Sequence, residues 1–327
     1  MGKRSRPNVF QGSLKKKFYF EGWYNKIVDS SANHIYAIIP TIALNKKEKT
    51  SHAFIQYLDG INASVEYFKY RLEDFENLSN KKYKIQIGKN YFSLERIHID
   101  IDQQNHKIKG DLEYINPILW PKKFLQPGVM GWFSYVPFME TYHGMVSMNH
   151  EIRGTLTIDG EFINFDNGKG YIEKDWGKSF PSAWVWTQSN HFSNPNLSFM
   201  FSIAKIPFLG MKFNGFLSAL WYEGDFYKFA TYTSAKIKSL DILPDILHVI
   251  VEDKKYTLDF QVAKKGIGSG LLKAPKVGVM SGHIAESINS KIRLKLFDKR
   301  KEILIIDDLG INAGLEIKDP EVLKPKK

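Results

Sequence analysis

Apolar and polar residues alternate along much of this 327-residue chain. The clearest run is Ser93–Ile101, in which apolar and polar residues alternate over most of its length. A period of two is typical of a strand with one buried face, because successive side chains point to opposite sides of a sheet. Other runs also carry strand signals and predict short strands at residues 35–39, 51–57, 83–87, 108–112, 155–158, 162–165, 198–203, 217–222, 226–232, 255–262, 291–297 and 302–308.

Turn residues separate these runs. Asp-Gly and Asn-Gly favour tight hairpins because glycine tolerates a positive φ. Weak helical periodicity is confined to Val65–Arg71 and Leu240–Leu247. Many short strands joined by hairpins indicate an all-β chain, folded as antiparallel barrels or a sandwich with few short helices. The predicted turns are Asp59-Gly60, Asp159-Gly160, Asn167-Gly168 and Glu223-Gly224.

The composition narrows the class of protein. Aromatic residues make up 14% of the chain, which favours β structure around a wide apolar interior. There is no cysteine, so disulfide and thiolate chemistry are excluded. No apolar run reaches the roughly 18 residues that a membrane span needs. The basic start, Met1–Arg6, lacks the apolar core of a secretory signal. We therefore expect a cytoplasmic protein that is soluble or peripheral at a membrane.

The formal net charge of +11 raises the question of an anionic partner. Basic runs can attract anionic lipid or nucleic acid, but they are more often solvated ends and turns. No stacking or groove-reading element is evident, so we expect no nucleic-acid partner. Peripheral contact with an anionic membrane surface stays open. The basic clusters lie at Lys3–Arg6, Lys15–Lys17, Lys299–Lys301 and Lys324–Lys327.

The region from Ile115 to Gly144 is rich in proline, glycine and aromatic residues and is too broken for one long strand. It is interpreted either as a long loop over the mouth of a cavity or as an aromatic plug at one end of a barrel.

The segment Glu173–Asn190 holds two carboxylates and three tryptophans. Acids among indoles are typical of an apolar cavity, where their pKa values shift. In an extended strand, Glu173 and Asp175 point to one face and Lys174 to the other. The alternative is a strand corner whose carboxylates bind Lys174 or Lys178.

This segment resembles the tocopherol cyclase family, whose plant members carry Glu-Lys-Asn-Trp-Gly, then Phe-Pro, then Trp-x-Trp-x-Gln-x-Asn at the same spacing. Other segments agree with the family's motifs in the same order, so the resemblance runs from about residue 18 to residue 317. These segments are Phe20–Tyr24, Met139–Gly144 with Ser147, Leu272–Pro275 and Gly314–Glu316.

The resemblance implies two lipocalin-like antiparallel barrels, which we place at residues 16–180, with the long aromatic loop, and 181–320. It also implies closure of a chromanol ring on a prenylated quinol or related isoprenoid. The prenyl double bond is protonated and the phenol oxygen captures the cation, with no cofactor. The alternative function is a non-catalytic carrier or sensor of a hydrophobic ligand, since one fold hosts both roles.

Asp175 is the first candidate proton donor. Plant members have Asn at this position, and an amide cannot be a general acid, so Glu173 is its partner or its alternative. His143, with Glu140 three residues before it, is the next candidate because a histidine beside a carboxylate can shuttle protons. A satisfied core histidine is the other interpretation of His143.

For contact with the substrate we expect a second set of aromatic and polar residues, each of which could instead be structural. Buried aromatic and amide side chains often serve only packing or backbone hydrogen bonding. The nine histidines show no metal-binding spacing such as His-Glu-x-x-His, so no metal site is expected. The expected contact residues are Trp176, Trp184, Trp186, Gln188, Asn190, Glu140, Glu21 and Trp23.

Overall fold

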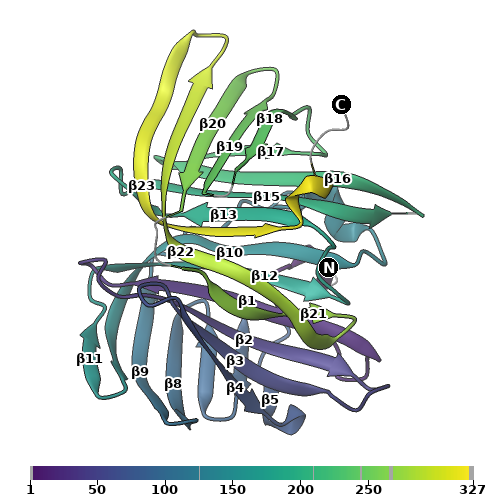
Figure 1. Cartoon of the computed structure of the whole chain (residues 1–327), viewed down its shortest axis with the longest axis vertical. Helices are drawn as coiled ribbons and strands as arrows, with labels where there is room; N and C mark the ends of the chain where they lie inside the picture. Colours follow the sequence, from purple (N-terminus) through teal and green to yellow (C-terminus); the bar gives the residue numbers. More distant parts are fainter. Residues whose placement is uncertain (1–2, 125, 209, 244, 265–267, 324–327) are drawn as a thin grey trace. The chain divides into compact units, whose positions relative to one another are not determined.

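The computed structural model confirms the all-β, lipocalin-like class (Figure 1). It describes residues 3–124, 126–208, 210–243, 245–264 and 268–323. The chain forms two compact units, Met1–Phe180 with Leu271–His283, and Pro181–Gly270 with Ile284–Lys327. The sequence-based division assigned Leu271–His283 to the second barrel, whereas this segment groups with the first unit. The division into two barrels stays a prediction.

The first unit contains a 12-stranded antiparallel sheet with the order β4-β3-β2-β1-β12-β10-β9-β8-β7-β6-β5, and β11 pairs with β10. Every consecutive pair up to β9 except β4 and β5 is hydrogen-bonded, as expected for hairpins. The strands are β1 (Phe18–Val28), β2 (Ile35–Asn45), β3 (His52–Asp59), β4 (Ser64–Tyr70), β5 (Phe75–Asn77), β6 (Lys84–Ile87), β7 (Asn90–Ser93), β8 (Arg96–Gln103), β9 (His106–Ile115), β10 (Thr141–Ile158), β11 (Glu161–Asn164) and β12 (Gly168–Gly177).

An 11-stranded antiparallel sheet follows in the chain, with the order β17-β16-β15-β13-β23-β22-β20-β19-β18; β14 pairs with β23 and β21 pairs with β22. β21 and the start of β22 belong to the first unit. The strands are β13 (Trp184–Ser189), β14 (His191–Phe192), β15 (Leu197–Phe208), β16 (Met211–Tyr222), β17 (Asp225–Ala230), β18 (Lys236–Ile242), β19 (Ile246–Glu252), β20 (Tyr256–Ala263), β21 (Gly270–Lys276), β22 (Val279–Asp298) and β23 (Ile303–Lys318).

The two segments with weak helical periodicity do not form helices in their described residues. Val65–Arg71 lies almost entirely in β4, and Leu240–Leu247 covers the end of β18 and the start of β19, with residue 244 outside the described part. Within the described residues no helix is long and apolar enough to cross a membrane. The helical elements are the 3₁₀ turns η1 (Lys3–Ser5), η2 (Leu72–Asp74), η3 (Gly131–Tyr135) and η4 (Pro320–Val322).

The predicted turns are confirmed at the hairpins. Asp159 and Gly160 have φ values of 52° and 91°, and they join β10 to β11. Both central residues of a type I′ turn need a positive φ, which explains the Asp-Gly pair. The predicted strand Ser93–Ile101, however, is broken, because β7 ends at Ser93 and β8 begins at Arg96. The Ser93 hydroxyl accepts hydrogen bonds from the backbone N–H groups of Glu95 and Arg96, at 3.1 and 3.0 Å, and this closes the turn.

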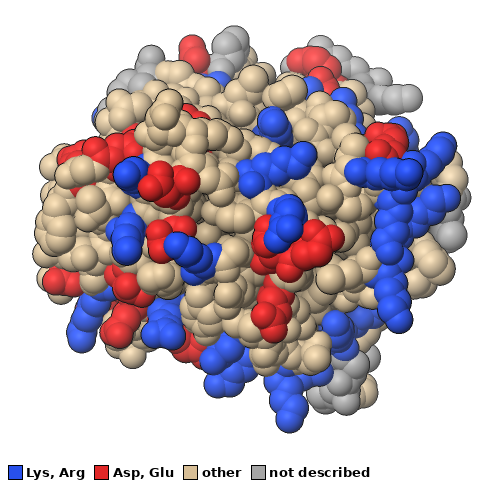
Figure 2. Space-filling model, turned by 90° about the horizontal axis from the view of Figure 1, so that it is seen from below, with Lys and Arg blue, Asp and Glu red and all other residues tan. Residues whose placement is uncertain are grey.

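How far the side chains of a strand are buried depends on where the strand lies in the sheet. β8 alternates between buried and more exposed residues, whereas β1 and β12 are buried along almost their whole length. Each unit has its own apolar cluster of buried side chains. In the first unit Trp23 stacks on Tyr83, with ring centroids 5.4 Å apart. Figure 2 shows lysine and arginine interspersed with acidic side chains over much of one face, with a denser basic group along one margin.

Candidate functional site

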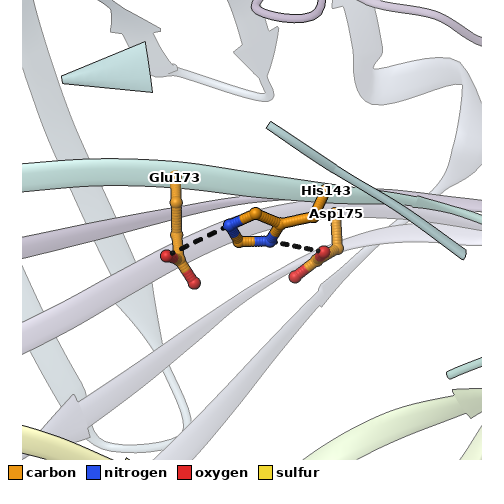
Figure 3. Close-up of side chains that lie close together, drawn as sticks. All are labelled: His143, Glu173 and Asp175. Carbon is orange, nitrogen blue, oxygen red and sulfur yellow. Dashed lines mark hydrogen bonds and ion pairs between the residues drawn. The ribbon is translucent and has the colours of Figure 1, made fainter. Parts of the chain in front are cut away.

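β10 and β12 run side by side and bring together the three predicted catalytic residues, His143, Glu173 and Asp175 (Figure 3). His143 is the register partner of Asp175, and Met145 is the register partner of Glu173. Alternation along a strand then places His143, Glu173 and Asp175 on the same face of the sheet. Register, rather than proximity in sequence, builds this cluster.

The imidazole of His143 lies between the two carboxylates. Its Nδ1 is 3.0 Å from Oδ1 of Asp175, and its Nε2 is 3.6 Å from Oε2 of Glu173. The side chains are 13% exposed for His143, 6% for Glu173 and 29% for Asp175. Asp175 is therefore the member of the cluster that is most open to its surroundings.

The electrostatics of the cluster favour a protonated imidazole. Burial lowers the pKa of His143, but the charges of Asp175 and Glu173 and the hydrogen bond to Asp175 outweigh burial and raise that pKa to about 9. Tyr171 donates a hydrogen bond to Glu173 from the same face. Burial, together with the charge of Glu173, raises the pKa of Tyr171 well above its usual value, so its hydroxyl keeps its proton.

These side chains could also hold a cation. One ligand atom from each of His143, Glu173 and Asp175 lies within 4.8 Å of the other two. A nitrogen and two carboxylates form a donor set that suits several divalent metals once the histidine is neutral. The donors come from two strands, so no metal-binding spacing is visible along the chain. The expectation of no metal stays a prediction.

The opposite face of β12 carries a second buried pair. Lys174 and Glu21 form an ion pair in which neither side chain is exposed. Glu21 also accepts hydrogen bonds from the backbone N–H groups of Gln11 and Gly12 and from the hydroxyl of Tyr19. The interpretation that Lys174 binds Glu173 or Asp175 is therefore wrong. The head-group role expected for Glu21 stays a prediction.

Aromatic rings enclose this pair. The Lys174 ammonium lies 4.8 Å from the ring centroid of Trp23 and 4.7 Å from that of Trp176. Trp176 stacks on Tyr142, its register partner, with centroids 5.5 Å apart. Trp23 and Trp176 thus share a face with Lys174 and not with the carboxylates of β12.

The other predicted contact residues are not part of the cluster of His143, Glu173 and Asp175. Glu140 precedes β10, where its backbone carbonyl accepts the N–H of Lys178, and the carboxylates that flank His143 are Asp175 and Glu173 rather than Glu140. The remaining four belong to the second unit, in or just after β13, and all are buried; they are Trp184, Trp186, Gln188 and Asn190.

β13 presents its tryptophans on one face and its core residues on the other. Val185 belongs to the apolar cluster of the second unit, and its neighbours Trp184 and Trp186 point away from that cluster. The indole Nε1 of Trp184 donates a hydrogen bond of 2.7 Å to Glu316 on β23. Tyr171 and Glu316 were not among the expected site residues. Tyr171 had a signal in the sequence because it lies two residues before Glu173 on the same face of a strand, and Glu316 had one because it belongs to the motif-like segment Gly314–Glu316.

The loop between β9 and β10 helps to line a cavity of about 1000 Å³ in the first unit. It contributes Phe124, Tyr135, Phe138 and Met139 to the wall. The choice between a loop over a cavity mouth and an aromatic plug at one end of a barrel stays open for residues 115–144. The loop holds one short helix, η3, and no strand in its described part.

Three known proteins share either sequence or fold with this chain. A chloroplastic protein of Oryza sativa subsp. japonica, named as a probable tocopherol cyclase, is 28% identical over 202 residues, which are 59% of this chain and 42% of that protein. The chain thus matches about two fifths of its relative's length. The crystal structure of CghA with Sch210972 superposes with a TM-score of 0.58 at 10% identity and covers 92% of this chain and 89% of that chain.

Kievitone hydratase from Nectria haematococca superposes with a TM-score of 0.52 at 11% identity, over 96% of this chain and 94% of that chain. At such low identity the two superpositions establish the fold alone. The model of the family described as tocopherol cyclase-like matches residues 79–318. That match spans most of the sequence and agrees with the ordered motifs, so the chain belongs to the tocopherol cyclase-like family.

Proposed function

We propose that the protein is an enzyme that closes a chromanol ring on a prenylated quinol or a related isoprenoid. Family membership and the name of the rice relative support this proposal. The ring closure is an isomerisation. A proton adds to one carbon of the prenyl double bond, the phenol oxygen bonds to the other carbon, and the phenol proton leaves. Atoms and electrons balance without an oxidant, a reductant or a second substrate. The reaction therefore needs an acid that protonates the double bond and a base that takes the phenol proton.

One observation carries the proposal: His143 lies between Asp175 and Glu173. With a pKa raised to about 9 by the two carboxylates against the effect of burial, His143 holds a proton at neutral pH. Groups that interact this strongly titrate as a unit. The cluster can therefore deliver a proton to the prenyl carbon through Glu173 and take the phenol proton back through the imidazole of His143.

The proton transfer and the ring closure belong to one step. An isolated tertiary cation lies far above a carboxylic acid or an imidazolium in energy, so complete protonation before ring closure would be slow. Bond formation by a phenol oxygen already held against the carbon lowers that barrier. Tyr24 is the register partner of Glu173 on β1, and an aromatic ring on this face can stabilise the partial positive charge.

A second candidate function is a non-catalytic carrier or sensor of a hydrophobic ligand. The aromatic-lined cavity in the first unit favours it. The two functions differ in one respect that can be measured, because a carrier releases its ligand unchanged.

The test is anaerobic incubation with a prenylated hydroquinone in D₂O, followed by mass spectrometry. A cyclase forms a chromanol that contains one deuterium which does not exchange, at the carbon that received the proton. We expect the double variant Glu173→Gln/Asp175→Asn to form no chromanol. The matched control is Glu113→Gln/Asp102→Asn, which changes exposed carboxylates of the same unit and should keep the wild-type rate.

Each result decides between the candidates. Wild-type turnover in the Glu173/Asp175 double variant would remove the cluster from the mechanism. Recovery of the hydroquinone unchanged from a stable complex with the wild-type protein would overturn the cyclase in favour of the carrier.

A further inference from the structure

The cavity of about 1000 Å³ in the first unit is lined by both aromatic and basic side chains. Its aromatic part includes Tyr19, Tyr142 and Trp176, and no aspartate or glutamate is among the described residues that line it. Five basic side chains complete the wall. They are Lys3, Arg4, Lys16, Lys17 and Lys178.

These cations have no acidic partners within the part of the chain that the structure describes. Among the described residues, no carboxylate lies within ion-pair distance of any of the five. Arg4 donates a hydrogen bond of 3.0 Å to the backbone carbonyl of Tyr135, and the Lys16 ammonium lies 3.8 Å from the ring centroid of Tyr19. Burial lowers the pKa of Lys16, and the charges of Lys3 and Arg4 lower it further, although Glu21 acts in the opposite direction. An anion bound here would offset the repulsion between Lys16 and its neighbours Lys3 and Arg4.

The aromatic residues that line the cavity are also in contact with other side chains of the first unit. Trp176 stacks on Tyr142 at an interplanar angle of 9°, and Lys174 lies 4.7 Å from the Trp176 ring. The hydroxyl of Tyr19 is engaged by Glu21. The rings therefore present a fixed apolar surface to the cavity, and no reorganisation is needed for an apolar group to pack there.

We propose that this cavity binds an amphipathic anion, with an apolar chain or ring against Tyr142 and Trp176 and a phosphate or carboxylate among the five basic side chains. A volume of about 1000 Å³ can hold such a molecule. A neutral quinol carries no charge to neutralise these basic side chains, so this site is distinct in chemistry from the proposed cyclase site. It is also distinct in place, because Tyr142 and Trp176 lie on the opposite face of β10 and β12 from His143 and Asp175.

The test is calorimetric titration of the full chain with farnesyl phosphate and palmitate, and with the matched neutral alcohols farnesol and hexadecanol. We expect both anions to bind about tenfold more tightly than their alcohols, since charge-assisted hydrogen bonds are the stronger kind. Added salt should weaken binding of the anions and leave binding of the alcohols unchanged.

Variants of the basic side chains test where the anionic head group of the ligand binds. Lys16→Gln/Lys178→Gln should weaken binding of farnesyl phosphate about tenfold or more and leave farnesol unaffected. The matched control is Lys81→Gln/Lys109→Gln, which removes the same charge from exposed positions of the same unit outside the cavity lining. It should bind farnesyl phosphate like the wild type.

Three results would overturn the proposal. They are equal affinity for anion and alcohol, equal weakening in the control variant, and binding only when palmitate is embedded in vesicles of phosphatidylglycerol. The Glu173→Gln/Asp175→Asn variant should bind farnesyl phosphate normally, so failure of the cyclase proposal leaves this one standing.

Discussion

Asp175 and His143 are register partners on adjacent strands, and their side chains meet at 3.0 Å. The pairing places a carboxylate at one ring nitrogen, while Glu173, two residues earlier on β12, lies at the other. An imidazole held in this way is stabilised in its charged form, and both the chemistry and the pH dependence of the protein should reflect it.

The free energy of unfolding should depend on pH through His143. The pKa of its imidazole is about 9 in the folded chain, against 6.5 for the ordinary group. The folded state therefore binds the proton more tightly, and the resulting stabilisation is complete below pH 6.5 and disappears as the pH rises through 9. Urea unfolding of the wild type and of His143→Gln across this range measures the effect. The difference between the two proteins should shrink as the pH rises, and a constant difference would contradict the assignment.

The two carboxylates should differ in their effect on chromanol formation. Glu173→Gln should lower the rate about a hundredfold or more, since an amide cannot exchange a proton. Asp175→Asn should cost less, because the Asn carbonyl still accepts the hydrogen bond from Nδ1 of His143 and the similar plant motif has Asn at this position. Single-turnover rates of the two variants decide the order. A larger loss for Asp175→Asn would identify that residue as the donor.

The strands and turns could be predicted from the sequence because their signals are local. Alternation gave most of the strands, and Asp-Gly gave the hairpin at Asp159. Val65–Arg71 shows weak helical periodicity because seven partly apolar residues fit either period, and pairing of β4 with β3 decides in favour of a strand. The break after Ser93 depends on one hydroxyl that caps two backbone N–H groups.

The candidate site could be predicted only in part. Alternation correctly placed Glu173 and Asp175 on one face of β12. The meeting of His143 with Asp175 needs the register of β10 against β12, which pairs residues 32 positions apart. The pairing of Lys174 with Glu21 spans 153 positions. The sequence offers no local signal for either contact, so the acids beside Lys174 are the only partners that the sequence suggests for it, in the alternative interpretation of Glu173 and Asp175.

The buried pair of Glu21 and Lys174 should contribute strongly to stability as a unit. Lys174→Met leaves a carboxylate without its cation at a position with no exposure, which should cost about 3–5 kcal/mol of the free energy of unfolding. In Glu21→Gln/Lys174→Met the neutral amide still accepts the N–H groups of Gln11 and Gly12, so this double variant should be more stable than Lys174→Met. Urea unfolding of both variants tests the coupling. As a control, Lys81→Met at an exposed position should change stability by less than about 0.5 kcal/mol. If Lys174→Met also lowered the free energy of unfolding by less than about 0.5 kcal/mol, the ion pair would contribute nothing to stability.

In the second unit, the hydrogen bond from Trp184 to Glu316 joins β13 to β23. Trp184→Phe keeps an aromatic ring but removes the donor, which leaves Oε2 of Glu316 without the indole N–H and should cost about 1–3 kcal/mol. Glu316→Gln keeps an acceptor and should cost less. The matched control is Trp221→Phe, which makes the same truncation at a ring that is 7% exposed, like Trp184. Thermal unfolding of the three variants separates the loss of the hydrogen bond from the loss of ring area. Equal destabilisation by Trp184→Phe and Trp221→Phe would assign the effect to packing alone.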